Sequence, residues 1–244
     1  MYKYSFLFVL LLTGNALLAQ EADAWKEPSK ESQAYHEYRL KDVRNLYNFQ
    51  KIRKIADGIK SDGNGNTRID AKIYQDLTLR EKFTYHLINP ESYEQNCDAE
   101  PPIQDEHKKI FGFLIDIYGE SSWSDRQRKF FIGNRDSVMK FVVEYAERDK
   151  HLGVELKNVL EIINPKEMVP FLIKMYNIEK KDHDILTLLM IIMRDNQYAP
   201  FMESQSYKKL YGEEYSYGNF LVFNSANEAL ILQRATDFYN GLNK

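Results

Sequence analysis

One stretch of the sequence carries oxygen-bearing side chains at the spacing of a calcium-binding loop. In Asp62–Asp70 such side chains stand at the first, third, fifth and ninth positions, and the apolar Ile69 stands at the eighth. However, Thr67 replaces the glycine that forms the sharp turn at the sixth position, and Ile73 replaces the bidentate glutamate at the twelfth. We therefore expect a turn between two helices, keep calcium as the alternative, and assign no metal ligand.

Other residue types that support catalysis lie far apart or stand directly side by side. Asp182-His183-Asp184 places two carboxylates around a histidine, but adjacent residues cannot all point at one ion. Glu213 and Glu214 are likewise adjacent, whereas a pair of acids for sugar hydrolysis must face each other across a cleft. The sequence contains no nucleophile elbow, phosphate loop or dinucleotide fingerprint. We expect no catalytic residue and no cofactor, and lean towards a protein that is not an enzyme.

Aromatic residues are the more informative group, with 17 tyrosines and 14 phenylalanines. Tyrosine gives a large contact area at a small entropic cost, so clusters of it favour interfaces. Four tyrosines recur among lysines and glutamates near the C-terminus, and Trp123 precedes a predicted helix start. The alternative is that these rings line the wall of the fold. The predicted partner-binding residues are Tyr207, Tyr211, Tyr215, Tyr217 and Trp123.

The charge is unevenly distributed along a chain whose formal net charge is only −3. Residues 39–60 carry seven basic side chains against Asp42 and Asp57, and residues 91–107 carry six acidic side chains without lysine or arginine. Either the two segments face each other, or one of them attracts a partner of opposite sign. The overall balance gives no support for nucleic-acid binding, which requires a basic field.

Apolar residues recur with helical period along nearly the whole chain, and turn-forming residues are few, so we expect an all-α fold. One helical stripe, with Leu40, Val43 and Tyr47 on it, is predicted from Glu31 to Lys60. Another helix is expected to hold Ile110–Tyr118. Residues 220–223 fit a strand or a helix equally well. The predicted helix Ile185–Met193 is apolar on all sides, so it must be covered on all sides. Predicted helix N-caps are Asp70, Ser124, Asp136 and, within a capping box, Ser225.

A shift of 30 residues aligns similar side chains across Ser124–Tyr211. It superposes Phe130 on Leu160 and Met190, and each unit reads as a helix, a tight corner and a second helix. This pattern resembles the HEAT and armadillo class of stacked helical hairpins. The resemblance implies a short irregular α-solenoid that binds a protein or peptide, and it transfers no catalytic residue. The alternative architecture is an irregular helical bundle.

The first 19 residues have the pattern of a secretory signal peptide. Lys3 is followed by the apolar run Phe6–Leu12, and Ala19 offers a small residue before the cleavage point. We therefore expect a periplasmic or secreted protein whose single domain occupies residues 20–244, with no membrane span after cleavage. Cys97 is the only cysteine, so no internal disulfide can form, and its role stays open.

These observations lead to a leading hypothesis and two alternatives. The first is an exported binding protein that holds a protein or peptide on its helical surface, with an inhibitor or immunity protein as one concrete form. The second is an envelope hydrolase that acts on cell-wall glycan or peptide through residues scattered along the sequence. The third is a structural subunit whose copies are joined through Cys97 or an aromatic face.

Overall fold

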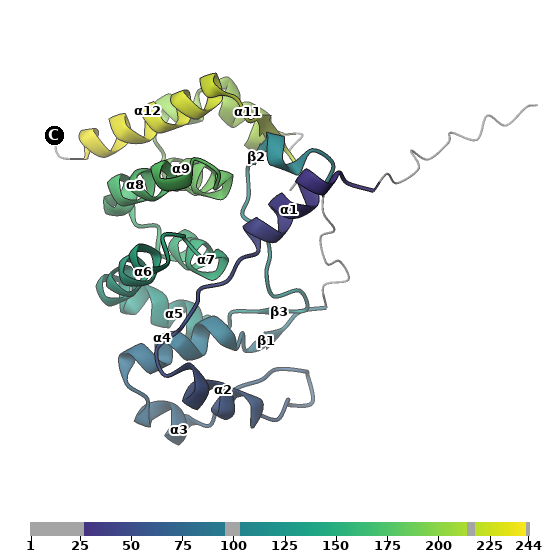
Figure 1. Cartoon of the computed structure of the whole chain (residues 1–244). Coiled ribbons are helices and arrows are strands. Elements are labelled where there is room, and N and C mark those ends of the chain that lie inside the picture. Colours follow the sequence, from purple (N-terminus) through teal and green to yellow (C-terminus); the bar gives the residue numbers. More distant parts are fainter. Residues whose placement is uncertain (1–26, 96–102, 214–217, 243–244) are drawn as a thin grey trace, which may run out of the picture.

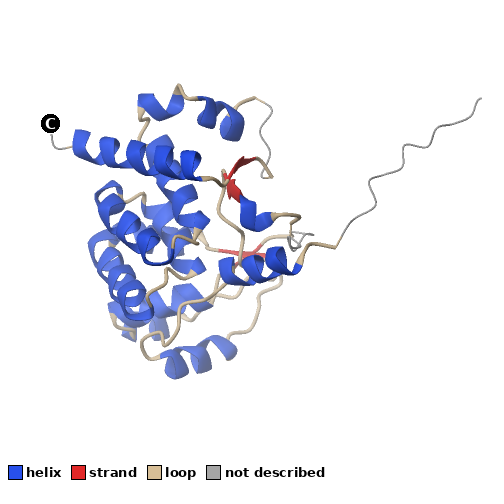
Figure 2. Ribbon diagram, turned by 45° about the horizontal axis from the view of Figure 1, so that its top comes forward, coloured by secondary structure: helices blue, strands red, loops and turns tan. Residues whose placement is uncertain are grey.

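The chain folds mostly into helices, and the longest described connection, between Ile88 and Asp125, contains three short strands (Figures 1 and 2). The structure is a computed structural model that describes residues 27–95, 103–213 and 218–242. No described helix is long and apolar enough to cross a membrane. The α-helices are α1 (Lys30–Arg39), α2 (Phe49–Asp57), α3 (Ala71–Asp76), α4 (Leu79–Ile88), α5 (Asp125–Gly133), α6 (Arg135–Asp149), α7 (Val154–Ile163), α8 (Val169–Glu179), α9 (His183–Asp195), α10 (Ala199–Met202), α11 (Gln205–Tyr211) and α12 (Ser225–Gly241).

Extended structure is limited to two small antiparallel pairs in the described part of the chain. Strands β1 (Ser92–Tyr93) and β3 (Ser121–Ser122) form one pair. Strands β2 (Lys109–Phe111) and β4 (Phe220–Val222) form the other, with Ile110 opposite Leu221. Two 3₁₀ turns, η1 (Glu106–Lys108) and η2 (Lys166–Met168), precede β2 and α8. The expectation of an all-α fold is thus confirmed at the level of a mostly helical chain.

Side-chain caps fix several helix starts where the sequence predicted them. The side chain of Asp70 accepts hydrogen bonds from the first turn of α3, and Ser124 forms a capping box with Gln127 at the start of α5. Two predicted caps are wrong by one or two positions. Helix α6 begins after Asn134, so Asp136 lies inside its first turn, and α12 is capped by Asn224 instead of Ser225.

The second half of the chain forms a stack of antiparallel helices. Helix α7 packs between α5 and α9, and α8 lies between α6 and α12 in the neighbouring layer (Figure 1). Helices α5, α7 and α9 form the first layer of the stack. Each of them ends at an asparagine, namely Asn134, Asn164 and Asn196. The side-chain amide of Asn196 donates a 2.8 Å hydrogen bond to the side-chain oxygen of Asn164, which ties two neighbouring corners together.

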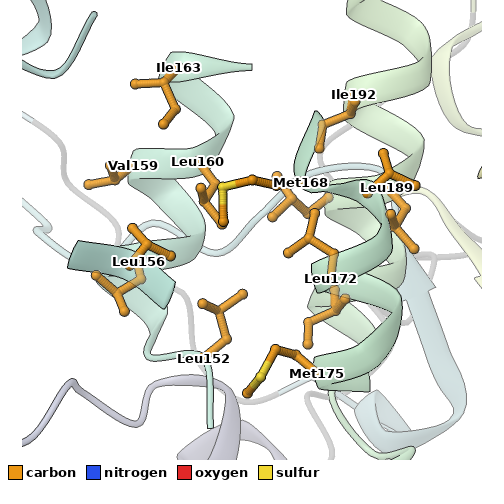
Figure 3. Packing of buried hydrophobic residues seen from close by; sticks show 14 of the residues in the cluster. Leu152, Leu156, Val159, Leu160, Ile163, Met168, Leu172, Met175, Leu189 and Ile192 are labelled. Atoms are coloured by element: carbon orange, nitrogen blue, oxygen red, sulfur yellow. The ribbon is translucent and has the colours of Figure 1, made fainter. Parts of the chain in front are cut away.

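One hydrophobic core runs through this stack, from Val43 near the N-terminus to Phe238 on α12. Figure 3 shows Leu160 of α7 next to Met168 of η2, with Leu172 of α8 on the same facing side. The prediction for residues 185–193 is confirmed, because every one of these side chains is buried. Covering them removes apolar surface from water on all sides of α9, which is the main driving force for the stack.

Two segments of the chain lie along the α7 and α9 side of the stack, where α1 is seen in Figures 1 and 2. One consists of α1 and the residues that follow it, 40–48. We name residues 40–48 the strap. The other runs from η1 through β2 to residue 123. The hydroxyl of Thr187 on α9 donates to the carbonyl of Phe111, and the backbone N–H of Val154 on α7 donates to the carbonyl of Lys41. The chain therefore covers part of its own helical surface.

Two helix predictions in these covering segments are wrong. The stripe from Glu31 to Lys60 is interrupted by the strap, because Asn45 and Asn48 adopt left-handed backbone conformations with φ of 48° and 51°. Residues 110–118 form no helix either, since β2 pairs with β4. Residues 220–222 are correspondingly a strand. Pairing between distant segments decides both β2 and β4, and a local pattern does not contain it.

Candidate functional site

Two of the predicted partner-binding tyrosines make their contacts inside the fold. Tyr207 and Tyr211 on α11 are half-buried, with their ring centroids 5.3 Å apart. The hydroxyl of Tyr211 donates a 2.6 Å hydrogen bond to the carbonyl of Gly112. Tyr215 and Tyr217 lie outside the described residues. The placed pair therefore anchors α11 to the segment that follows β2.

The predicted role of Trp123 in partner binding is wrong. Its side chain is only 6% exposed, and its indole N–H donates a 2.7 Å hydrogen bond to the carbonyl of His86. The ring also packs edge-on against Tyr118 and Phe131. Trp123 stands directly before the cap of α5, and its ring packs into the core there.

The calcium-like loop uses its first carboxylate within the loop itself. Asp62 accepts hydrogen bonds from the backbone N–H groups of Asn64 and Asn66 and from the amide of Asn66. These bonds lower the pKa of Asp62, the one to the Asn66 side chain most strongly. Among the described residues, no group of three or more acids, histidines or cysteines could hold a metal. The geometry is that of the helix–helix turn, which was our primary expectation.

In the acid–histidine triplet at 182–184, the two aspartates join a buried charged cluster while the histidine ring turns to a different partner. Asp182 bonds the ammonium of Lys157, and the ring Nδ1 of His183 lies 2.9 Å from the carbonyl of Lys109. Asp184 bonds the guanidinium of Arg39. Glu213 is described, but Glu214 is not, and Cys97 likewise lies outside the described residues. The triplet therefore joins three different elements to α9 and forms no single site.

Arg39, Glu106, Lys157, Asp182 and Asp184 form a buried charged cluster between α1, η1, α7 and α9. Arg39 contacts Glu106 at 2.6 Å and Asp184 at 2.9 Å, while Lys157 contacts Asp182 at 3.0 Å and Asp184 at 3.3 Å. Every side chain in the cluster is almost fully buried. Burial alone would raise the pKa of Asp184, but Arg39 and Lys157 lower it to about 2. The charges therefore serve to fix α1 against α9.

Fixing α1 also fixes the beginning of the strap, whose backbone N–H groups are then held by side chains from two helices. The N–H groups of Val43, Arg44 and Tyr47 donate to Glu155, Asp149 and the hydroxyl of Tyr145, at distances of 3.1, 3.2 and 3.1 Å. These partners belong to α6 and α7. Three N–H groups satisfied by side chains of the helical core restrict the strap backbone to a defined conformation.

The strap carbonyl groups are satisfied in the same manner. Arg148 on α6 donates to the carbonyls of Arg44 and Asn45, and the hydroxyl of Thr84 on α4 donates to the carbonyl of Tyr47 at 2.8 Å. Asn45 and Asn48 adopt left-handed backbone conformations. Such conformations persist when contacts with the surrounding structure hold the backbone in place. Side chains of α4, α6 and α7 thus form six hydrogen bonds to the backbone of this short turn.

The strap and the first turn of α2 line a surface pocket of about 680 Å³, which we name the strap pocket. Its base contains the buried side chains of Val43 and Leu46. Phe49 lies in its wall and is 37% exposed, and the neighbouring Tyr47 is 42% exposed. The guanidinium of Arg80 lies 5.1 Å from the Tyr47 ring centroid and supports that ring from behind. The remaining lining residues are Asn45, Asn48, Gln50 and Lys51.

Next to the strap, Glu155 at the start of α7 has an unusual protonation equilibrium. Burial, and then the neighbouring Asp42, raise the pKa of Glu155 to about 8. Its carboxylate accepts the Val43 N–H bond, and its side chain is closed in by Gly153 and Val43. A pair of acids in which one pKa is strongly raised is often found in active sites. Here, however, Glu155 accepts the hydrogen bond that holds the strap.

Comparison with family models, with curated proteins and with solved structures finds no match for this chain. The site is therefore defined by geometry. Sequence reasoning missed the strap pocket because Tyr47 was placed on the buried stripe of a continuous helix. The pair of asparagines at 45 and 48 is the signal that could have located the turn, since asparagine tolerates positive φ.

Proposed function

We propose that this protein is an exported, non-enzymatic binding protein that holds a protein or peptide partner, with the strap pocket as its contact site. The export signal at residues 1–19 supports the periplasmic or secreted location, although that segment lies outside the described residues. An inhibitor or immunity protein is one concrete form of such a binder. In this proposal the helical stack is a rigid support and not the contact surface itself.

The repeated spacing of the stack supports its description as a short α-solenoid. Helices α5, α7 and α9 begin at Asp125, Val154 and His183, and these starts are separated by 29 residues each time. The 30-residue shift found in the sequence therefore corresponds to one step between successive first-layer helices. Stacked hairpins share one core and present extended surfaces that bind partners. This arrangement supports a binding role more directly than a catalytic one.

One observation supports the choice of site above all others. The strap places the exposed ring of Tyr47 next to the exposed ring of Phe49 at the start of α2, and its backbone is held by side chains of neighbouring helices. A preorganised contact surface of this kind loses little entropy on binding. Aromatic side chains in defined pockets dominate the energy of protein interfaces. The rings of Tyr207 and Tyr211 on α11 are half-buried and contact each other, whereas Tyr47 and Phe49 are open to solvent.

Site-specific photocrosslinking tests the proposed function. A photoreactive amino acid placed at Phe49 in the exported chain is expected to trap a discrete partner in the producing cells. The matched control is the same amino acid at Ile178, which is exposed to a similar extent but lies at the end of α8. Crosslinks of equal yield and identity at both positions, or at neither, would contradict the assignment of the site.

A further inference from the structure

We propose that the strap pocket receives an acidic peptide segment of the partner that inserts an aromatic or branched aliphatic side chain. The inference rests on the proposed function, because it names the chemistry of the partner at the same site. Three features of the described surface support it. They are the charge around the pocket, its apolar base and the amide groups along its wall.

The segment that contains all the pocket-lining residues is more basic than the chain as a whole. Residues 41–60 contain six basic and two acidic side chains, a net charge of +4, whereas the whole chain has a net charge of −3. Lys51 is paired with Glu81 and Arg53 with Asp57. Arg44 and Lys54 make no ion pair within the described part of the chain, and both are exposed.

These two cations are close in the chain to residues that line the pocket. Arg44 stands between the lining residues Val43 and Asn45. Lys54 follows Gln50 by one helical turn on α2 and therefore shares its face. The nearby acids Glu81 and Asp149 are each bonded to basic side chains, namely Lys51 and Arg148. Asp42 interacts with the carboxyl group of Glu155. A complementary partner must therefore carry negative charge near the pocket.

The apolar base of the pocket requires more than charge from its occupant. Val43 and Leu46 form the base, and Phe49 contributes an exposed ring, so a purely polar chain would leave apolar surface in contact with water. The volume of about 680 Å³ lies in the range of pockets that enclose one or more side chains. An inserted aromatic or branched aliphatic side chain buries this surface.

The wall of the pocket favours a polypeptide over a lipid surface or a nucleic acid. Asn45 and Gln50 are exposed, and each amide both donates and accepts hydrogen bonds, as the peptide backbone does. Phosphate groups accept hydrogen bonds and would leave the amide oxygens unused. An extended acidic segment satisfies the amides, the cations and the apolar base together.

Three short fluorescein-labelled peptides with one central phenylalanine, flanked by glutamates, glutamines or lysines, test the inference with the chain from residue 20. Fluorescence anisotropy at low salt is expected to show binding of the glutamate peptide that is roughly tenfold tighter than that of the glutamine peptide. Replacing its phenylalanine by alanine is expected to weaken binding by a similar factor. Added salt should reduce the difference between the charged and neutral peptides.

Matched charge reversals locate the effect. The double variant Arg44→Glu/Lys54→Glu should abolish the preference for the glutamate peptide, whereas Lys208→Glu/Lys209→Glu on α11 should preserve it. Both pairs are exposed, and circular dichroism checks that each variant is folded. Equal affinity for all three peptides, or equal loss in both variants, would overturn the inference. So would competition by vesicles of phosphatidylglycerol or by single-stranded DNA that displaces the glutamate peptide completely.

The failure of this inference is distinguishable from the failure of the proposed function. A specific crosslink at Phe49 combined with indifference to peptide charge would retain the site and reject the acidic segment. Loss of the crosslink together with loss of peptide binding would reject both.

Discussion

The side-chain Oε2 atom of Glu155 lies 3.1 Å from the backbone nitrogen of Val43 and accepts its hydrogen bond. This contact joins the first turn of α7 to the strap, more than one hundred positions earlier in the chain. It also places a carboxyl group whose pKa is raised to about 8 beside Asp42. The stability of the strap should therefore depend on pH.

The free energy of unfolding should decrease as the pH rises from about 4.5 to about 8. The pKa of Glu155 in the folded chain lies above its ordinary value of 4.5, so its contribution is present below pH 4.5 and is lost as pH rises through 8. Each unit by which the pKa is raised corresponds to about 1.4 kcal/mol. Glu155→Gln, which retains an acceptor for Val43, should flatten this dependence in urea unfolding.

Asp42→Asn is the companion variant for this prediction. It removes the neighbouring negative charge, so the pKa of Glu155 should decrease and the variant should be more stable than the natural chain near pH 8. Parallel stability profiles for the natural chain and for Glu155→Gln would show that Glu155 is not responsible.

Lys157→Met should strongly destabilise the protein. The change keeps a similar volume but leaves Asp182 and Asp184 without their shared ammonium group inside the core. Removing one partner from a buried ion pair typically costs about 3–5 kcal/mol. The exposed pair Lys174 and Glu147 provides the control, because Lys174→Met should change the urea midpoint very little. Equal small effects at both positions would show that the charged cluster is not essential.

Gly153→Ala should displace the strap. A methyl group at this position would lie 2.5 Å from the Val43 Cγ2 atom and 2.8 Å from its backbone nitrogen, so either residue must move. Such overpacking costs about 1–3 kcal/mol. Hydrogen exchange of the Val43, Arg44 and Tyr47 amides should accelerate in the variant. The control is Gly133→Ala at the end of α5, where a Cβ atom would meet nothing within 4 Å. Acceleration in both variants would contradict the steric argument.

Tyr211→Phe separates a structural role of α11 from a role in binding. The change removes the hydroxyl that donates to the carbonyl of Gly112, which should cost about 0.5–1.5 kcal/mol in the free energy of unfolding. The yield of the crosslink at Phe49 should stay unchanged, because Tyr211 does not line the strap pocket. A large loss of crosslinking in a folded Tyr211→Phe protein would indicate that α11 contributes to partner binding, as the sequence predicted.

The sequence by itself determined the parts of this protein that depend on local pattern. Helical periodicity gave the mostly helical character, the apolar residues 185–193 identified α9 as the central helix, and Asp70 and Ser124 marked true helix starts. Such features depend on residues within one or two turns of each other, so one sequence contains them.

Only the tertiary structure decided which aromatic residues face solvent and how the strap is held. Trp123 and Tyr211 looked like candidates for an interface, but distant carbonyl groups at His86 and Gly112 turn them inward. Tyr47 was assigned to a buried stripe and is half exposed. The partners that shape the strap come from residues 84 and 145–155, and long-range hydrogen bonds of this kind leave no periodic signal in a sequence.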